Sequence, residues 1–376
     1  MSEPIRDIVI LGGGSAGWLT AGVLAAAHPS RDETSVRVTL VESPDVKTIG
    51  VGEGTWPSMR DTLRHMGVSE ADFFRECDAA FKQASRFSGW ITGAPDDHYY
   101  HPFSPPAGYG DINVVPAWSR LTGAPKFADV VTYQTRLCDE GRGPKQPRTP
   151  EFAAVANYAY HLDAGKFGEF LKAHCIEKLG VHYVQAHVQE VVSAESGDIA
   201  GLRTAEDSII RGDLFIDCTG FASVLIGQHF GVPLQSTRPW LFCDTALALQ
   251  VPHDQPDQPI APYTNATAQP CGWIWDIGLP TRRGVGHVFS SDHVDLETAE
   301  RQLLDYVSRT TQRAQDDLPA PRKLDLNPGY RETFWHRNCV AVGISAGFIE
   351  PLEASALALI ELSAKMIADD LPPTRA

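Results

Sequence analysis

The sequence predicts an α/β protein built on a parallel sheet, with an antiparallel sheet inserted into the chain. Three observations predict this fold class. Residues 5–12 form a short β-branched run that ends at glycine and precedes a helical stretch and another apolar run. Residues 240–290 alternate between apolar and polar positions, as half-buried antiparallel strands do. Residues 339–343 form one more short apolar strand near the end of the chain.

The first element is a βαβ unit. Residues 5–12 and 36–42 read as strands and residues 15–27 as the helix between them, so the two strands should be parallel with a right-handed crossover. The other elements expected, in order, are a mostly helical stretch over 58–86, an irregular insertion over 91–150, a helix over 161–179, strands over 181–193, 199–204 and 213–217, a helix over 295–308 and a helix over 354–370.

Composition narrows the class of protein. The chain has 376 residues, 43% of them hydrophobic, which suits one large domain or two closely packed ones. Its net charge of −15 disfavours nucleic acid and anionic membranes as partners. We see no leader peptide and no apolar run that would cross a bilayer, and therefore expect a cytoplasmic protein. Seven scattered cysteines without a CxxC motif indicate reduced thiols and no metal site.

The first loop carries a GxGxxG pattern formed by Gly12, Gly14 and Gly17. The pattern alone is weak, but here it follows a strand, opens a helix, and is followed by an acid, Glu42, at the end of the second strand. This context predicts a dinucleotide site. The alternative is a glycine-rich turn in some other α/β fold.

Each residue type of this motif has a physical role. Gly12 permits the tight turn, Gly14 lets the backbone approach a pyrophosphate, and Gly17 lets helix and strand pack closely. Ser15 and Ala16 begin the helix, whose unpaired N–H groups favour phosphate. Glu42 would accept hydrogen bonds from ribose hydroxyls.

Two later strands also end in glycine turns, at Thr219-Gly220 and at Gly343. Three glycine-tipped strands in this order favour FAD over NAD. We therefore expect an FAD-binding Rossmann-like fold of the two-dinucleotide-binding, monooxygenase-like type. The expected FAD-binding domain is discontinuous and comprises residues 1–90, 155–235 and 335–376. The expected substrate-side sheet and loops comprise residues 91–154 and 236–334.

Four further segments resemble flavin-dependent halogenases of the tryptophan-halogenase type, and the resemblance covers nearly the whole chain. The segments are Gly50 to Pro57 (GVGEGTWP), Phe74 to Lys82 (FRECDAAFK), Trp273 to Pro280 (WIWDIGLP) and Phe348 to Ala356 (FIEPLEASA).

The resemblance implies roles for particular residues. Lys82 and Glu353 would be catalytic. The halide would be bound by the backbone N–H groups of Ser355 and Ala356. The flavin would be contacted by Gly50, Val51, Gly52, Glu53, Gly343 and Phe348. The aromatic substrate would be contacted by His101, Phe103 and Pro351.

The resemblance also implies a reaction. Reduced FAD from a separate flavin reductase, together with O2 and chloride or bromide, would give hypohalous acid. Lys82 would hydrogen-bond or covalently capture the oxidised halogen and direct it to an electron-rich, indole-type carbon. Glu353 would orient that species or take the ring proton. Because the family is often dimeric, a homodimer is expected.

Each assignment has a simpler alternative. Lys82 reads as a solvated residue of a charged helix, and Glu353 as an ordinary acid at a helix start. Trp273 and Trp275 lie two apart, so they would share one face of a strand and pack its core. The segment His101 to Phe103 reads equally well as a loop that packs its own aromatics.

The sequence departs from the family pattern in three places. Ala354 and Ala356 stand where relatives commonly have serine and glycine, so the backbone at the halide site should be more restricted and a serine hydroxyl is missing. Gly278 and Leu279 separate Ile277 from the proline of the tryptophan signature. The sequence ends at residue 376, where relatives continue into a helical region, which favours an indole larger than free tryptophan, a peptide, or no turnover.

Other functions are open to the same fold. Gly343 to Gly347 matches the GxSxG of a hydrolase nucleophile, but no histidine follows residue 336, which excludes the required triad order. A flavin monooxygenase or reductase shares the fold without needing Lys82 and Glu353. A truncated flavin-binding protein without turnover is the third alternative.

Overall fold

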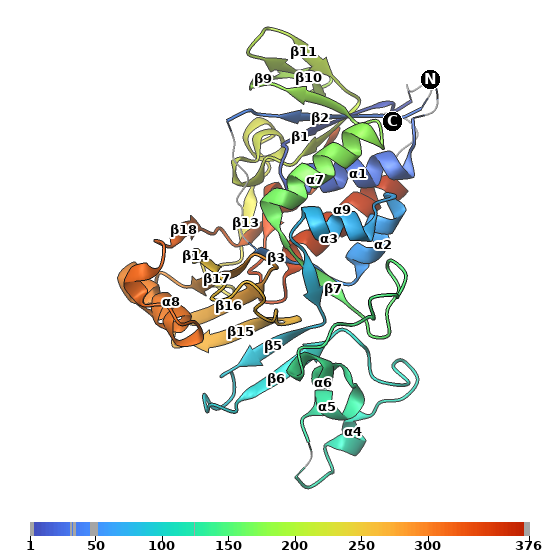
Figure 1. Ribbon diagram of the computed structural model, residues 1–376. Helices are drawn as coiled ribbons and strands as arrows, with labels where there is room; N and C mark the ends of the chain where they lie inside the picture. Colours follow the sequence, from blue (N-terminus) through green and yellow to red (C-terminus); the bar gives the residue numbers. More distant parts are fainter. Residues whose placement is uncertain (1–3, 31, 33–34, 46–51, 124, 372–376) are drawn as a thin grey trace.

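A six-stranded sheet, with β1 and β2 in the upper part of Figure 1, forms one part of the protein in a computed structural model that describes residues 4–30, 32, 35–45, 52–123 and 125–371. Its order is β20-β21-β12-β1-β2-β8, and neighbouring strands are parallel except for the pair β20–β21. The strands are β1 (Asp7–Leu11), β2 (Arg37–Glu42), β8 (His182–Gln185), β12 (Leu214–Asp217), β20 (Trp335–His336) and β21 (Cys339–Ala341). The helix α1 (Ser15–Ala27) joins β1 to the parallel β2, which confirms the predicted βαβ unit.

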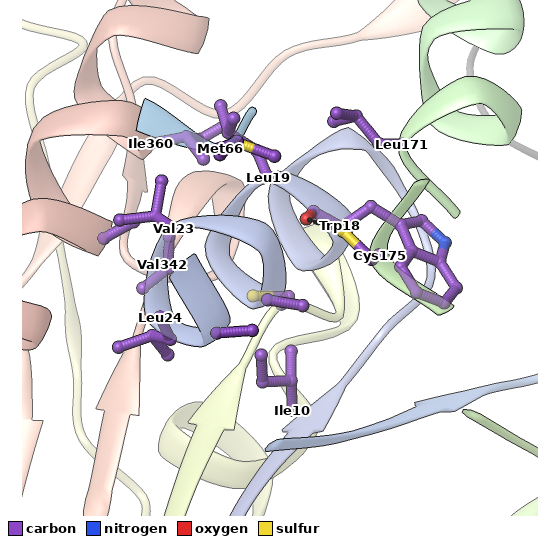
Figure 2. Close-up of a cluster of buried hydrophobic side chains, with 14 of the residues drawn as sticks. Ile10, Trp18, Leu19, Val23, Leu24, Met66, Leu171, Cys175, Val342 and Ile360 are labelled. Atoms are coloured by element: carbon purple, nitrogen blue, oxygen red, sulfur yellow. Dashed lines mark hydrogen bonds between the residues drawn. The ribbon is translucent and has the colours of Figure 1, made fainter. Parts of the chain in front are cut away.

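Helices cover one face of this sheet. Ile8 and Ile10 of β1 point into a core shared with α1, α7 (Ala164–Glu177) and α9 (Ser355–Asp369). Figure 2 shows Leu19 and Val23 of α1 among side chains from these neighbours, including Ile360 of α9. Because α1 is enclosed on nearly every side, it is apolar all round rather than amphipathic.

A small antiparallel meander lies over the other face. It consists of β9 (Val188–Ser193), β10 (Ile199–Thr204) and β11 (Ile209–Arg211). Val9 and Leu11 of β1 point to this side, where they join a second buried cluster with Leu202. Because side chains alternate along β1, every second residue packs against the helices and the others pack against the meander.

The predicted second sheet is confirmed and has seven strands in the order β18-β14-β17-β16-β15-β5-β6. Its strands are β5 (Ala84–Ser88), β6 (His98–Pro102), β14 (Thr245–Pro252), β15 (Tyr263–Gln269), β16 (Gly272–Gly278), β17 (Arg282–Phe289) and β18 (Arg322–Asp325). All neighbours are antiparallel except β15 and β5. The helix α8 (Leu296–Thr310) packs on one face of this sheet.

A three-stranded sheet connects the two larger ones. It contains β3 (Gly52–Gly54), β7 (Ala159–Asp163) and β4 (Ala80–Lys82), with β7 in the middle. Two helices precede β4, namely α2 (Ser58–His65) and α3 (Glu70–Glu76).

The expectation of a mostly helical stretch over 58–86 is therefore wrong beyond Glu76. Asp78 adopts φ 51°, a left-handed conformation that a helix cannot continue through, and the chain turns into β4. The predicted helix over 161–179 likewise begins later, because Asp163 ends β7 and caps α7 by accepting from the N–H groups of Gly165 and Lys166.

Short elements complete the fold. The insertion over 91–150 contains α4 (Val115–Trp118), α5 (Phe127–Val131) and α6 (Gln134–Asp139) beside β6, so it is less irregular than expected. The remaining elements are β13 (Leu234–Ser236), β19 (Gly329–Arg331), β22 (Gly347–Phe348), the 3-10 helices η1 (Gly220–Ala222), η3 (Gln315–Asp317) and η4 (Gly343–Ser345), and the π-helix η2 (Val224–His229). The domain boundaries stay a prediction; β5 (Ala84–Ser88), from the segment assigned to the FAD-binding domain, belongs to the seven-stranded sheet.

Within the described ranges, no helix has the length and apolar character needed to cross a membrane. No group of three or more His, Cys, Asp or Glu side chains suited to holding a metal ion occurs in the same part of the chain.

Candidate active site

The loop between β1 and α1 has room for glycine and for no larger residue at two positions. A Cβ on Gly12, whose φ is +117°, would lie 2.3 Å from the carbonyl oxygen of Cys218. A Cβ on Gly17 would lie 1.8 Å from the carbonyl oxygen of Gly12. At Gly14 the opposite holds, because nothing lies within 4 Å of the Cβ position. The loop is thus closed on the protein side and open where a pyrophosphate would approach.

The N-terminus of α1 faces this open space. Gly14 is the N-cap and supplies no side-chain cap, and the first turn contains no acidic residue. Ser15 and Ala16 begin the helix as predicted, so their N–H groups lack intrahelical acceptors. Such an end favours an anion.

Glu42 lies beside the same loop. A Cβ on Gly13 would come within 2.3 Å of the Glu42 carboxyl group. The carboxylate accepts hydrogen bonds from Lys172 Nζ and Tyr183 Oη, each at 2.8 Å. These partners lie on α7 and β8, and nothing near Glu42 in the sequence pointed to them. The open loop, the uncapped helix and the fixed carboxylate together fit the phosphates and ribose of a dinucleotide.

The two other glycine turns reach the same region. A Cβ on Gly343, at φ +72°, would lie 2.9 Å from the Cβ of Ala16, so the turn after β21 abuts the start of α1. Gly220 also has a positive φ, of 65°, and is followed by Phe221. The ring of Phe221 lies 6.2 Å from that of Phe348, centroid to centroid. Phe221 was not anticipated from the sequence.

Three separate segments converge on Lys82. A Cβ on Gly54 of β3 would lie 3.1 Å from Lys82 Nζ and 3.3 Å from the Cβ of Ala354. The ring of Phe103 lies 5.4 Å from Lys82 Nζ. The predicted flavin loop, the predicted catalytic lysine and the loop that precedes α9 therefore meet at one point.

Lys82 is a buried lysine, not the solvated one that its charged surroundings in the sequence suggested. It is 1% exposed, and within the described residues it forms no hydrogen bond or salt bridge. Burial lowers its pKa to about 8, against the opposing effect of the nearby carboxylates of Glu353 and Glu53. An ammonium group without a partner is costly to bury, which points to a functional role.

Glu353 is held by three contacts. Its side chain accepts a hydrogen bond from Ser85 Oγ at 3.3 Å and lies 3.1 Å from His101 Nδ1. Its backbone carbonyl accepts from Trp56 Nε1 at 2.9 Å. The hydrogen bond to Glu353 raises the pKa of His101. Ser85 thus contacts the carboxylate and Trp56 the backbone of Glu353, and neither contact could be predicted from the sequence.

Two more titratable side chains lie close to Lys82. Burial raises the pKa of Glu53 to about 7, with Lys82 acting in the opposite direction. His161 of β7 is fully buried, and burial together with Lys82 lowers its pKa well below the usual range. The Nε2 atom of His161 is 2.8 Å from Thr264 Oγ1. The lysine thus sits beside two acids and a neutral imidazole.

Two of the predicted substrate residues, Phe103 and His101, lie beside Lys82 and Glu353. Phe103 is fixed by the bond from its N–H to the carbonyl of Gln83, at 3.0 Å, next to Lys82. His101 lies two residues earlier on β6 and contacts Glu353. Pro351 is half-buried in the loop between β22 and α9. Gly50 and Val51 lie outside the described residues.

The structure brings together a dinucleotide loop, a buried lysine and a glutamate, and the sequence as a whole matches a known protein family. The family model for tryptophan halogenases matches residues 7–376. The chain belongs to the tryptophan halogenase family. It is accordingly a flavin-dependent halogenase, which uses reduced flavin from a separate reductase.

Individual members of the family are similar over nearly the whole chain. The tryptophan 6-halogenase SttH of Streptomyces toxytricini is 36% identical, over 97% of this chain and 72% of its own length. The tryptophan 7-halogenase RebH of Lentzea aerocolonigenes is 32% identical, over 99% and 71%. The crystal structure of a tryptophan halogenase from Shewanella frigidimarina superposes with a TM-score of 0.93 at 48% identity, and covers 99% of this chain and 72% of that one.

The residues predicted to bind halide do not show the backbone restriction expected from the loss of glycine. Ala354, at φ 53°, takes the left-handed conformation as N-cap of α9, and neither Ser355 nor Ala356 does. Those two residues are the first of the helix, where N–H groups lack intrahelical acceptors. A glycine at position 356 is therefore not needed to leave N–H groups free for an anion.

Proposed function

We propose that this halogenase replaces a ring hydrogen of an indole by chlorine or bromine, using FADH2 and O2, and that Lys82 delivers the halogen. The observation that carries the proposal is the burial of the residue Lys82 beside Glu353 and Phe103, with no hydrogen bond or salt bridge to its Nζ within the described residues. A lysine without a hydrogen-bond partner among the described residues is available to a transient partner.

FAD would be held by the Gly12–Gly17 loop, by Glu42 and by the turns at Gly343 and Phe348. When bound and reduced, it supplies with O2 the oxidising power that converts a halide into an electrophilic halogen. The halide would be bound by the N–H groups of Ser355 and Ala356.

Lys82 would hold the electrophilic halogen through Nζ, by a hydrogen bond or a nitrogen–halogen bond, next to the substrate ring. As the carbon–halogen bond forms, the ring carbon loses its proton to the carboxylate of Glu353, and the oxygen of the hypohalous acid leaves in water. Ser85 and His101 would keep that carboxylate oriented.

The substrate class is proposed from the wall of the site and from the relatives. Phe103 offers an aromatic face beside Lys82, which suits a flat, electron-rich ring. SttH and RebH are named for tryptophan, so tryptophan is the first substrate to test, followed by larger indoles and tryptophan-containing peptides.

The test is a reconstituted reaction with purified protein, FAD, a flavin reductase, NADH, O2 and either chloride or bromide, analysed by mass spectrometry. We expect a product with a halogen isotope pattern that requires halide, disappears in Lys82→Ala and persists in Lys323→Ala, a matched change on the surface of β18. Hydroxylated product that forms without halide would indicate a monooxygenase instead. Bound flavin without any product would indicate a flavin-binding protein. Light scattering of the same sample would test the proposed homodimer.

A further inference from the structure

The tryptophan signature of β16 has no part in the reaction proposed above, yet its first member touches the active-site loop. Trp273 is 4% exposed and belongs to a buried cluster on the sheet with Phe87 and Val288. Leu352, from the loop between β22 and α9, packs against the same cluster. The signature therefore lies under the segment that carries Glu353.

A partly buried hydrogen bond adds to this apolar contact. The indole Nε1–H of Trp273 donates to the carboxylate of Glu350, two residues before Leu352. Burial raises the pKa of Glu350, while the indole bond and the backbone N–H of Leu352 both stabilise its ionised form. A carboxylate in such surroundings is costly to leave without its donors, so the bond holds the loop strongly.

The loop needs such an anchor because its far end is strained. Ala354 has a left-handed backbone, and such conformations persist only where neighbouring contacts enforce them. Two tethers hold the chain just before the strained residue. Trp273 donates to Glu350, and Trp56 donates to the carbonyl of Glu353, which directly precedes Ala354.

We propose that Trp273 and Glu350 are positioning residues, which fix the loop so that the Glu353 carboxylate and the first N–H groups of α9 hold their geometry. Trp275 is different, although it lies on the same strand. Its ring packs against Gly286, where a Cβ would come within 2.1 Å of it. The pair of tryptophans thus divides into a loop anchor and a packing residue.

The experiment compares Trp273→Phe with Trp275→Phe, each of which replaces one indole by one phenyl ring. The first readout is hydrogen–deuterium exchange of the peptide spanning residues 348–356, which does not depend on catalysis. The second, which rests on the proposed function, is the KM for halide together with the halogenated product formed per NADH. We expect Trp273→Phe to speed exchange of this peptide about tenfold and to raise the halide KM by a similar factor, and Trp275→Phe to change neither.

Substitutions of Glu350 form the second part of the experiment. Glu350→Gln keeps an oxygen acceptor for the indole and should stay within about twofold of the wild type, whereas Glu350→Leu should reproduce Trp273→Phe. The double change Trp273→Phe with Glu350→Leu should be no worse than either alone, because both remove one bond. Equal exchange in Trp273→Phe and Trp275→Phe would overturn the proposal. So would a Glu350→Leu variant that behaves as the wild type. If the wild type formed no halogenated product, only the proposed function would fail, since the exchange comparison would still report on the anchor.

Discussion

Replacing Lys82 by methionine should make the protein more stable at neutral pH while removing its activity. The reason lies in the burial of Lys82, a residue that is 1% exposed and whose ammonium group forms no hydrogen bond or salt bridge in the described residues. Methionine has a similar length and flexibility but no charge to desolvate.

The size of the effect follows from the pKa of Lys82. In the folded protein this pKa falls from its usual 10.5 to about 8 because of burial. A fall of that size corresponds to about 3 kcal/mol of destabilisation at pH 7. The folded pKa lies below the unfolded one, so the cost is fully present below about pH 8 and disappears as the pH rises towards 10.5.

The assay is thermal unfolding of the wild type and of Lys82→Met at pH 7, 9 and 10.5. At pH 7 the variant should unfold about 4 °C higher, given the unfolding entropy of a chain of this length. The gain should shrink to about 2 kcal/mol at pH 9 and nearly vanish at pH 10.5. Lys323→Met, at the exposed surface, serves as the control and should show no such trend. An unchanged or lower melting temperature for Lys82→Met, or a gain independent of pH, would refute the argument that Lys82 is held ionised at a cost.

Three further predictions concern the cofactor loop and the carboxylate. Glu42→Ala should weaken FAD binding about 10- to 100-fold, because a charged acceptor for the ribose is lost. A flavin fluorescence titration measures the Kd, with Glu190→Ala as the control. An unchanged Kd in Glu42→Ala would contradict the role of Glu42. Gly12→Ala should abolish flavin binding, since its Cβ would meet the carbonyl of Cys218 at 2.3 Å; full flavin occupancy would show that the loop does not hold the cofactor. His101 has a raised pKa, so its charged pair with Glu353 exists at low pH and is lost as the pH rises through that pKa. His101→Phe should remove this inflection from the pH profile of kcat/KM, whereas a residue that only stacks on the substrate would leave the profile unchanged.

The elements that depend on local sequence could be predicted well. The first βαβ unit and the glycine loop follow from residues that are neighbours in the chain, and α1 has the bounds expected for it. The predicted helix through Lys82 failed because β4 exists only by pairing with β7, about 80 residues away. Local propensity carries no information about that partner.

The environment of the site residues was also beyond prediction. Lys82 is buried because β3, Phe103 after β6 and the loop before α9 close over it, and these segments are far apart in the sequence. The partners of Glu42, Lys172 and Tyr183, are brought to it by α7 and β8. The residue types were recognisable from the sequence, but their charges and partners depend on tertiary contacts.

The role of Lys82 is tested most directly by measuring product and peroxide together in Lys82→Met, with FAD, flavin reductase, NADH, O2, bromide and tryptophan. The wild type should give a brominated indole, seen as a pair of nearly equal isotope peaks. The variant should bind FAD and consume NADH at the wild-type rate, release hydrogen peroxide or hypobromous acid, and give no brominated product. A brominated product formed at the wild-type rate by Lys82→Met would contradict the claim that Lys82 delivers the halogen.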